Sequence, residues 1–215
     1  MPDAAPLEVR FLATPQGQAR ARIVAPQAER RGTVMLSHGA GGQRDSADIA
    51  ALAGALSSDG WVAALIDQPW RVAGRRVASA PPHLDAAYVP LVTALMSGAD
   101  ALPRPLVSAG RSAGARVACR TAAGVAADVV VAVSFPLHPP GRPERSRYAE
   151  LADAVALGIP VWVVQGERDA LGTPEELREA GLDPRHLRTV RGTHTPNADD
   201  VVAAVRTVLS GVDAG

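Results

Sequence analysis

The fold is decided by one stretch, Leu106-Val107-Ser108-Ala109-Gly110-Arg111-Ser112-Ala113-Gly114. Its first half is a short apolar run typical of a buried strand, and an alanine-rich helical segment follows it. Gly110 and Gly114 stand two residues before and after Ser112, so strand and helix can approach closely around a sharp turn. Such a turn places the Ser112 hydroxyl at a helix N-terminus, where free N–H groups favour a developing negative charge. The stretch predicts a strand–turn–helix unit that carries a nucleophilic serine.

Further apolar runs predict the sheet around this unit. Six of them are separated by stretches long enough for helices, which is typical of buried parallel strands; they are residues 33–37, 61–66, 106–109, 129–134, 160–165 and 187–190. Two alternating runs, residues 7–12 and 19–25, predict an antiparallel pair around a turn at Pro15-Gln16-Gly17. We therefore expect an α/β fold: a doubly wound, mostly parallel sheet of eight strands flanked by helices.

Apolar residues at helical spacing predict helices over residues 47–56, 84–96 and 201–209. Pro90 either kinks the second helix or marks its start. After the fourth parallel strand only residues 137–159 are free, and they accommodate a loop and one short helix. We expect no large cap domain and hence a shallow, open site.

Length and composition narrow the class of protein. The 215 residues fit one α/β domain spanning residues 1–215, and 47% of them are hydrophobic. All 22 basic residues are arginines, balanced by 22 acids and spread along the chain. This balance argues against binding to nucleic acid or to an anionic membrane surface. Small molecules are the expected partners, and the oligomeric state is not predicted.

The chain start and the cysteine content point to the cytoplasm. Residues 1–6, Met-Pro-Asp-Ala-Ala-Pro, lack a basic and apolar leader, and no uncharged apolar stretch reaches the ~20 residues that span a bilayer. Cys119 is the only cysteine, which excludes internal disulfides and a cysteine-based zinc cluster. No two of the five histidines have ligand spacing, so we expect no metal and no cofactor.

Reacting groups in an open parallel sheet gather at the carboxyl ends of the strands. Ser112 follows the third parallel run, Asp169 the fifth and His194 the sixth. A serine hydroxyl is a poor nucleophile near neutral pH, so it needs a base, and histidine titrates in that range. A carboxylate would hold the imidazole in one tautomer. We expect Ser112 as nucleophile, His194 as base and Asp169 as the acid that orients it.

A glycine-rich loop supplies the remaining part of the predicted site. Residues 37–42, Ser-His-Gly-Ala-Gly-Gly, directly follow the first parallel strand. They can bring the backbone N–H of Ala40 beside that of Ala113, forming an oxyanion hole. Gly39, Trp70 and His138 are candidate pocket residues. His38 is expected to be a structural hydrogen-bonding residue in this loop.

Residues 33–209 resemble an α/β-hydrolase, because elbow, oxyanion loop, acid and histidine occur in matching order. More narrowly, residues 110–116, 135–144 and 165–169 are similar to the Tex30-like and KAT8-regulatory-subunit-like branch, and more loosely to dienelactone hydrolases. The resemblance implies a compact serine hydrolase without a large lid, acting on small ester or thioester substrates. In animal members it includes a chromatin-complex subunit, so a catalytically silent binding or scaffold protein is the alternative.

Each site residue also has a structural interpretation. Ser112 could belong to an ordinary strand-to-helix connection, and Glu167 competes with Asp169 for the role of the acid. His194 could serve only the start of the last helix, although Asn197 is the better N-cap. Trp70 could pack beneath a solvated loop. Whether Arg71, Arg75 and Arg76 face the pocket is left open; if they do, they would favour an anionic substrate.

Overall fold

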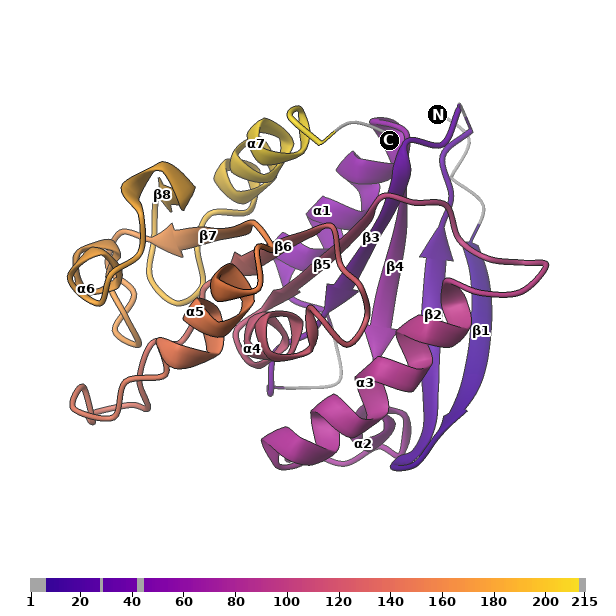
Figure 1. Cartoon of the computed structure of the whole chain (residues 1–215), viewed down its shortest axis with the longest axis horizontal. Coiled ribbons are helices and arrows are strands. Elements are labelled where there is room, and N and C mark those ends of the chain that lie inside the picture. Colours follow the sequence, from indigo (N-terminus) through magenta and orange to yellow (C-terminus); the bar gives the residue numbers. More distant parts are fainter. Residues whose placement is uncertain (1–6, 28, 42–44, 213–215) are drawn as a thin grey trace.

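A computed structural model describes residues 7–27, 29–41 and 45–212. Its centre is an eight-stranded sheet in the order β1-β2-β4-β3-β5-β6-β7-β8 (Figure 1). The strands are β1 Leu7–Thr14, β2 Gly17–Val24, β3 Gly32–Ser37, β4 Trp61–Asp67, β5 Leu106–Arg111, β6 Val129–Val133, β7 Val161–Gly166 and β8 Leu187–Val190. β2 pairs antiparallel with β1 and with β4, and every other pairing is parallel. The predicted α/β fold with eight mostly parallel strands is confirmed.

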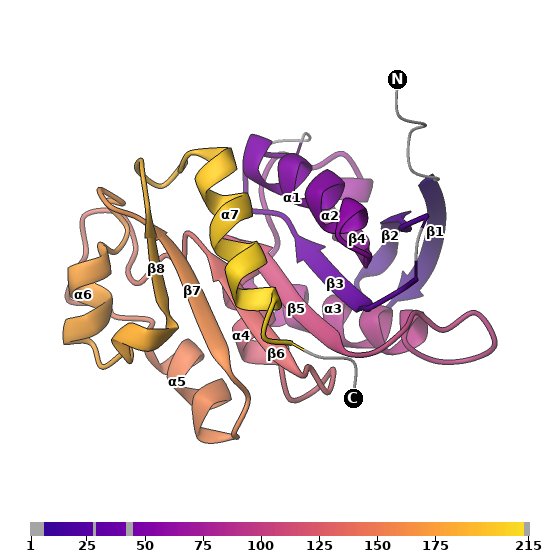
Figure 2. The same cartoon turned by 90° about the horizontal axis from the view of Figure 1, so that it is seen from above.

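Helices cover both faces of the sheet, which confirms the doubly wound arrangement (Figures 1 and 2). On one face α1 (Ala47–Ser58) and α7 (Ala198–Leu209) pack against each other. They cover the strand side chains that point to this face, such as Val107 and Val131. On the other face α3 (Pro81–Leu95), α4 (Ala113–Thr121) and α5 (Ala149–Ala156) cover the opposite side chains, such as Leu106 and Val130. The parallel strands are therefore buried on both sides, as their continuous apolar runs indicate.

The boundaries of several elements differ from those predicted. β5 continues two residues beyond Ala109, because Gly110 and Arg111 still pair with Ala132 and Val133 of β6. α3 begins at Pro81 and contains Pro90, so that proline is not the start of the helix. The short α2 (Pro69–Val72), α6 (Pro174–Glu179) and the 3₁₀ turn Pro184–His186 were not predicted, since one or two turns show no readable period.

The segment between β6 and β7 consists of a loop and α5, and the part of the chain that the structure describes forms no large cap. Over residues 7–27, 29–41 and 45–212, no helix combines the length and apolar character needed to cross a membrane. Two parts of the prediction lie outside the described residues: the chain start at residues 1–6, and Gly42 at the end of the glycine-rich loop.

Candidate active site

The turn at Ser112 has the strained geometry that its glycine neighbours predict. Ser112 has φ 54° and ψ −113°, in a region that side chains rarely occupy, and α4 starts at the next residue. A Cβ on Gly110 would lie 2.5 Å from the backbone of Gly114, and one on Gly114 would overlap the Ser37 carbonyl oxygen. The Ser112 N–H donates to the Val133 carbonyl at 2.9 Å, which ties the turn to β6. Only glycine at both flanks permits this close packing of strand, helix and β3.

Three side chains from three strand ends form one hydrogen-bonded chain. His194 Nε2 lies 2.9 Å from Ser112 Oγ, and His194 Nδ1 lies 2.9 Å from Asp169 Oδ2. A carboxylate accepts only, so the neutral ring donates its Nδ1–H to Asp169 and leaves Nε2 free to accept the Ser112 proton. The Asp169 side chain is fully buried, whereas 26% of the His194 side chain is exposed. The structure thus brings together all three residues that the sequence placed at the sheet edge.

Asp169 is held by further donors, which distinguishes it from Glu167. Its Oδ2 also accepts from Gln165 Nε2 at 2.9 Å, and its Oδ1 accepts from the Leu171 N–H at 2.9 Å. Glu167 is exposed and pairs with Arg168. Donors directed at both oxygens satisfy the buried carboxyl group and fix its orientation toward His194. Gln165 is a supporting residue that the sequence analysis did not single out.

The loop that carries His194 is fastened by two residues that the sequence analysis also missed. Gly166 at the end of β7 has no side chain, and a Cβ there would overlap the Thr193 carbonyl oxygen. Arg111 donates from Nη2 to the His194 carbonyl oxygen at 2.8 Å. Its Nε donates to Asp48 Oδ2 of α1 at 3.1 Å. Arg111 therefore couples the residue before Ser112 to the backbone of the histidine.

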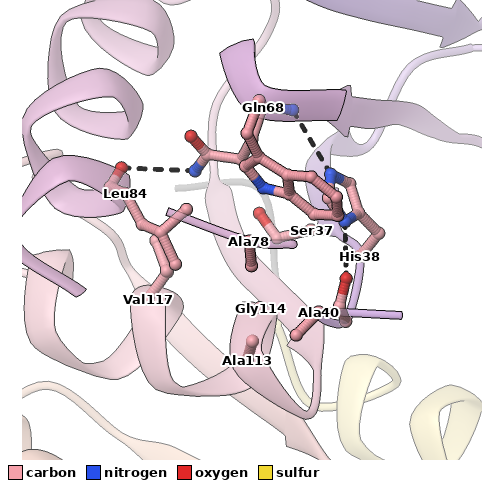
Figure 3. Close-up of a pocket in the computed structure, with 11 residues that line it drawn as sticks. Ser37, His38, Ala40, Gln68, Ala78, Leu84, Ala113, Gly114 and Val117 are labelled. Atoms are coloured by element: carbon pink, nitrogen blue, oxygen red, sulfur yellow. Dashed lines mark hydrogen bonds between the residues drawn. The ribbon is translucent and has the colours of Figure 1, made fainter. Parts of the chain in front are cut away.

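The glycine-rich loop lies against the serine, as expected. A Cβ on Gly39 would be 3.4 Å from Ser112 Cβ, and Ala40 and Ala113 line the same pocket. His38 shapes this loop: its Nδ1–H donates to the Gly39 carbonyl at 2.7 Å, and its Nε2 accepts from the Gln68 N–H at 3.3 Å (Figure 3). Burial lowers the pKa of His38, which favours the neutral ring that this pair of bonds requires. The geometry agrees with a structural role for His38.

The pocket beside the loop is small and mostly apolar. Its volume is about 230 Å³ when the open solvent at its mouth is counted, and its wall includes Trp70, Leu84 and Val117 as well as Ala40 and Ala113 (Figure 3). The Trp70 ring stands edge-on to His38 at 5.2 Å between centroids. Trp70 is 2% exposed, so it is packed in the interior and at the same time forms part of the apolar pocket wall. The space fits a short acyl group better than a long one.

One predicted pocket residue, His138, and three arginines whose placement the sequence left open lie outside this pocket. His138 does not line this pocket; it is buried after β6, and its Nε2 lies 3.5 Å from Glu176. Arg71 is buried and pairs with Asp45 and Asp67, and neither Arg75 nor Arg76 is among the lining residues. The question left open by the sequence is answered: none of these arginines lines the pocket. Across the described residues, no three His, Cys, Asp or Glu side chains are grouped as a metal site.

Comparison with known proteins agrees with this fold. The family model described as an alpha/beta hydrolase domain matches residues 30–198, and the chain belongs to that family. A serine hydrolase without lid from Xanthomonas campestris superimposes with a TM-score of 0.73 at 17% identity, covering 100% of this chain and 98% of that one. An alpha-beta serine hydrolase homologue from Coxiella burnetii gives 0.73 at 17% identity, with 94% and 95% covered.

A dienelactone hydrolase from Anabaena variabilis gives a TM-score of 0.68 at 19% identity, with 96% of each chain covered. No functionally curated protein matches the sequence. At these identities the solved structures establish the α/β-hydrolase fold and leave the substrate to be argued from the site.

Proposed function

We propose that this chain is a serine hydrolase that cleaves small ester or thioester substrates, working as one α/β-hydrolase domain. The observation that carries the proposal is the continuous chain from Ser112 Oγ to His194 to buried Asp169, with both contacts at 2.9 Å. A hydroxyl, a base and an orienting carboxylate in this order are what acyl transfer by serine requires. The narrower resemblance to the Tex30-like branch belongs to this proposal and rests on sequence alone.

The reaction proceeds in two halves. His194 Nε2 takes the proton of Ser112 as Oγ attacks the substrate carbonyl, and the imidazolium then gives that proton to the leaving alcohol or thiol. Water next attacks the acyl-enzyme, His194 accepts its proton, and Ser112 is regenerated as the acid departs. Asp169 stabilises the cationic ring in both halves.

The oxyanion would be bound by the N–H groups of Ala40 and Ala113. Both residues line the pocket next to Ser112, and Ala113 is the first residue of α4. Loss of one such donor costs about 3–4 kcal/mol of barrier in comparable sites. The pocket of about 230 Å³ and the lack of a large cap favour short acyl groups. The cytoplasmic location expected from the sequence stays a prediction.

Active-site labelling tests the proposal. A fluorophosphonate probe should label the wild type, and Ser112→Ala should abolish labelling while retaining the thermal transition of the folded protein. Ser134→Ala is the matched control, because Ser134 also follows a strand with a positive φ yet is fully buried and lies outside the hydrogen-bonded chain. A panel of short-chain aryl esters and acyl thioesters then identifies the substrate class. A folded wild type that neither labels nor turns over any member would favour the scaffold alternative.

A further inference from the structure

A second and larger hollow lies beside the proposed site. It is an open groove of about 870 Å³. Three elements border it: the start of α3, the helix α4 and the loop that follows β6. Its wall includes Pro81, Arg116, Pro139, Arg145 and Arg147. The start of α3 and this loop both lie toward the end of the sheet to which β3 and β4 point (Figure 1). The elements that line the groove therefore lie toward the same end of the sheet as Ser112, which follows β5.

The groove carries excess positive charge. Glu150 neutralises Arg116, whose Nε donates to it at 2.8 Å. Arg147 donates to the Pro136 carbonyl oxygen at 3.2 Å, and within the described part of the chain neither Arg145 nor Arg147 has an ion-pair partner. Burial, together with the neighbouring Arg116, lowers the pKa of Arg147. Glu144 is the one acid on the groove wall, and it is exposed.

The groove and the small apolar pocket are lined by different residues of the same two helices, α3 and α4. On α4, Val117 lines the pocket and Arg116 lines the groove; on α3, Leu84 lines the pocket and Pro81 the groove. The Arg116 N–H donates to the Ser112 carbonyl at 3.2 Å, so this arginine lies one helical turn from the serine. A substrate attacked by Ser112 can thus place one end in the pocket and extend the other toward the arginines.

We propose that this groove binds an anionic group, a carboxylate or a phosphate, on the leaving alcohol or thiol of the substrate. The inference rests on the proposed function. Arginine side chains recognise both anions through paired N–H donors. The acyl end is assigned to the small pocket because its wall is apolar, and the charged leaving group to the groove because the arginines line it. The leaving group must dissociate while the acyl group is still bound to Ser112, and an open groove lets it reach solvent at that stage.

Four esters test the assignment. They are the acetyl esters of neutral 4-hydroxybenzamide, of 4-hydroxybenzoate and of 4-hydroxyphenyl phosphate, and the succinyl ester of 4-hydroxybenzamide, which carries its charge on the acyl side. The readout is kcat/KM for each charged ester divided by that for the neutral acetyl ester. This ratio does not depend on how much of a preparation is folded. In the wild type we expect a ratio of about ten for one or both anionic leaving groups, falling as salt is added.

Arg145→Gln and Arg147→Gln should each lower that ratio severalfold, and Arg145→Lys should retain part of it. Arg178 is an exposed residue of α6 that lies outside the groove, so Arg178→Gln should leave the ratio at the wild-type value. The larger of the two ratios identifies carboxylate or phosphate as the preferred anion.

Three results would overturn the inference while leaving the proposed function standing: hydrolysis of the neutral ester with a ratio of one, an equal gain with the succinyl ester, or a ratio reduced by Arg76→Gln and not by the groove variants. A folded wild type that hydrolyses none of the four esters and is not labelled by the fluorophosphonate probe would overturn both proposals, whereas a labelled protein that hydrolyses none of them would overturn this inference alone.

Discussion

Arg111 donates a hydrogen bond of 2.8 Å to the carbonyl oxygen of His194, 83 residues further along the chain. The same guanidinium is anchored to Asp48, whose side chain is 1% exposed. The residue directly before the proposed nucleophile therefore determines where the backbone of the proposed base lies. Arg111 does not contact the reacting atoms and is a positioning residue.

Replacing Arg111 should impair turnover more than substrate binding. Arg111→Gln is expected to lower kcat about tenfold or more with a small change in KM, because a displaced imidazole no longer meets the serine in a reactive geometry. The rate of fluorophosphonate labelling should fall in parallel. Arg111→Lys, which keeps the charge, should recover part of kcat. Arg206→Gln is the control, since it breaks a surface pair with Asp59. A destabilised variant with an unchanged kcat would contradict the positioning role.

Gly114→Ala should destabilise the protein, because its Cβ would overlap the Ser37 carbonyl of β3. Backbone atoms cannot rotate away, so we expect a loss of about 1–3 kcal/mol in the free energy of unfolding. Chemical denaturation measures it. Gly54→Ala is the matched control: nothing lies within 4 Å of its Cβ in the middle of α1, and it should stabilise by roughly 0.5–1 kcal/mol. Equal effects of the two substitutions would refute the steric argument.

The pocket size predicts the acyl preference. The wild type should favour acyl chains of about two to four carbons, because the space is only about 230 Å³. Val117→Ala removes two methyl groups from its wall and should shift the optimum in kcat/KM toward longer chains. Val125→Ala removes the same groups from the same core without touching the pocket and should not shift it. A wild-type preference for long acyl chains would contradict the assignment.

Asp67 should make stability depend on acid pH. Burial alone would raise its pKa, yet the hydrogen bonds from Arg22 and Arg20 outweigh burial and lower the pKa below the ordinary 3.8. A lowered folded pKa means that the stabilisation is complete above the unfolded value and is lost as the pH falls through the folded one.

Removing this carboxylate tests the argument. Asp67→Asn should cost roughly 3 kcal/mol at pH 7, since it leaves Arg71 buried with one partner fewer, and should flatten the loss of stability below about pH 4. Denaturant titrations from pH 7 to pH 3 measure both effects. Glu175→Gln, in an exposed pair with Arg178, should change neither by more than about 0.5 kcal/mol. A pH profile of Asp67→Asn identical to that of the wild type would refute the role of Asp67.

The sequence by itself determined the local elements and their order. Buried parallel strands are continuous apolar runs, so these runs predicted the sheet. A serine flanked by glycines between a strand and a helix predicted a sharp turn. Because the carboxyl ends of parallel strands meet at one edge, chain order alone predicted that Ser112, Asp169 and His194 would meet, and their side chains do.

The tertiary structure decided the contacts that support these residues. Arg111 with His194, Gln165 with Asp169 and Gly166 with Thr193 depend on loop paths and side-chain directions that no local period encodes. It also separated the arginines: Arg71 pairs with Asp45 and with the buried Asp67, whereas Arg145 and Arg147 line an open groove. Periodicity reports which face of an element is buried, but not which distant side chain it meets there, because that depends on how the layers pack.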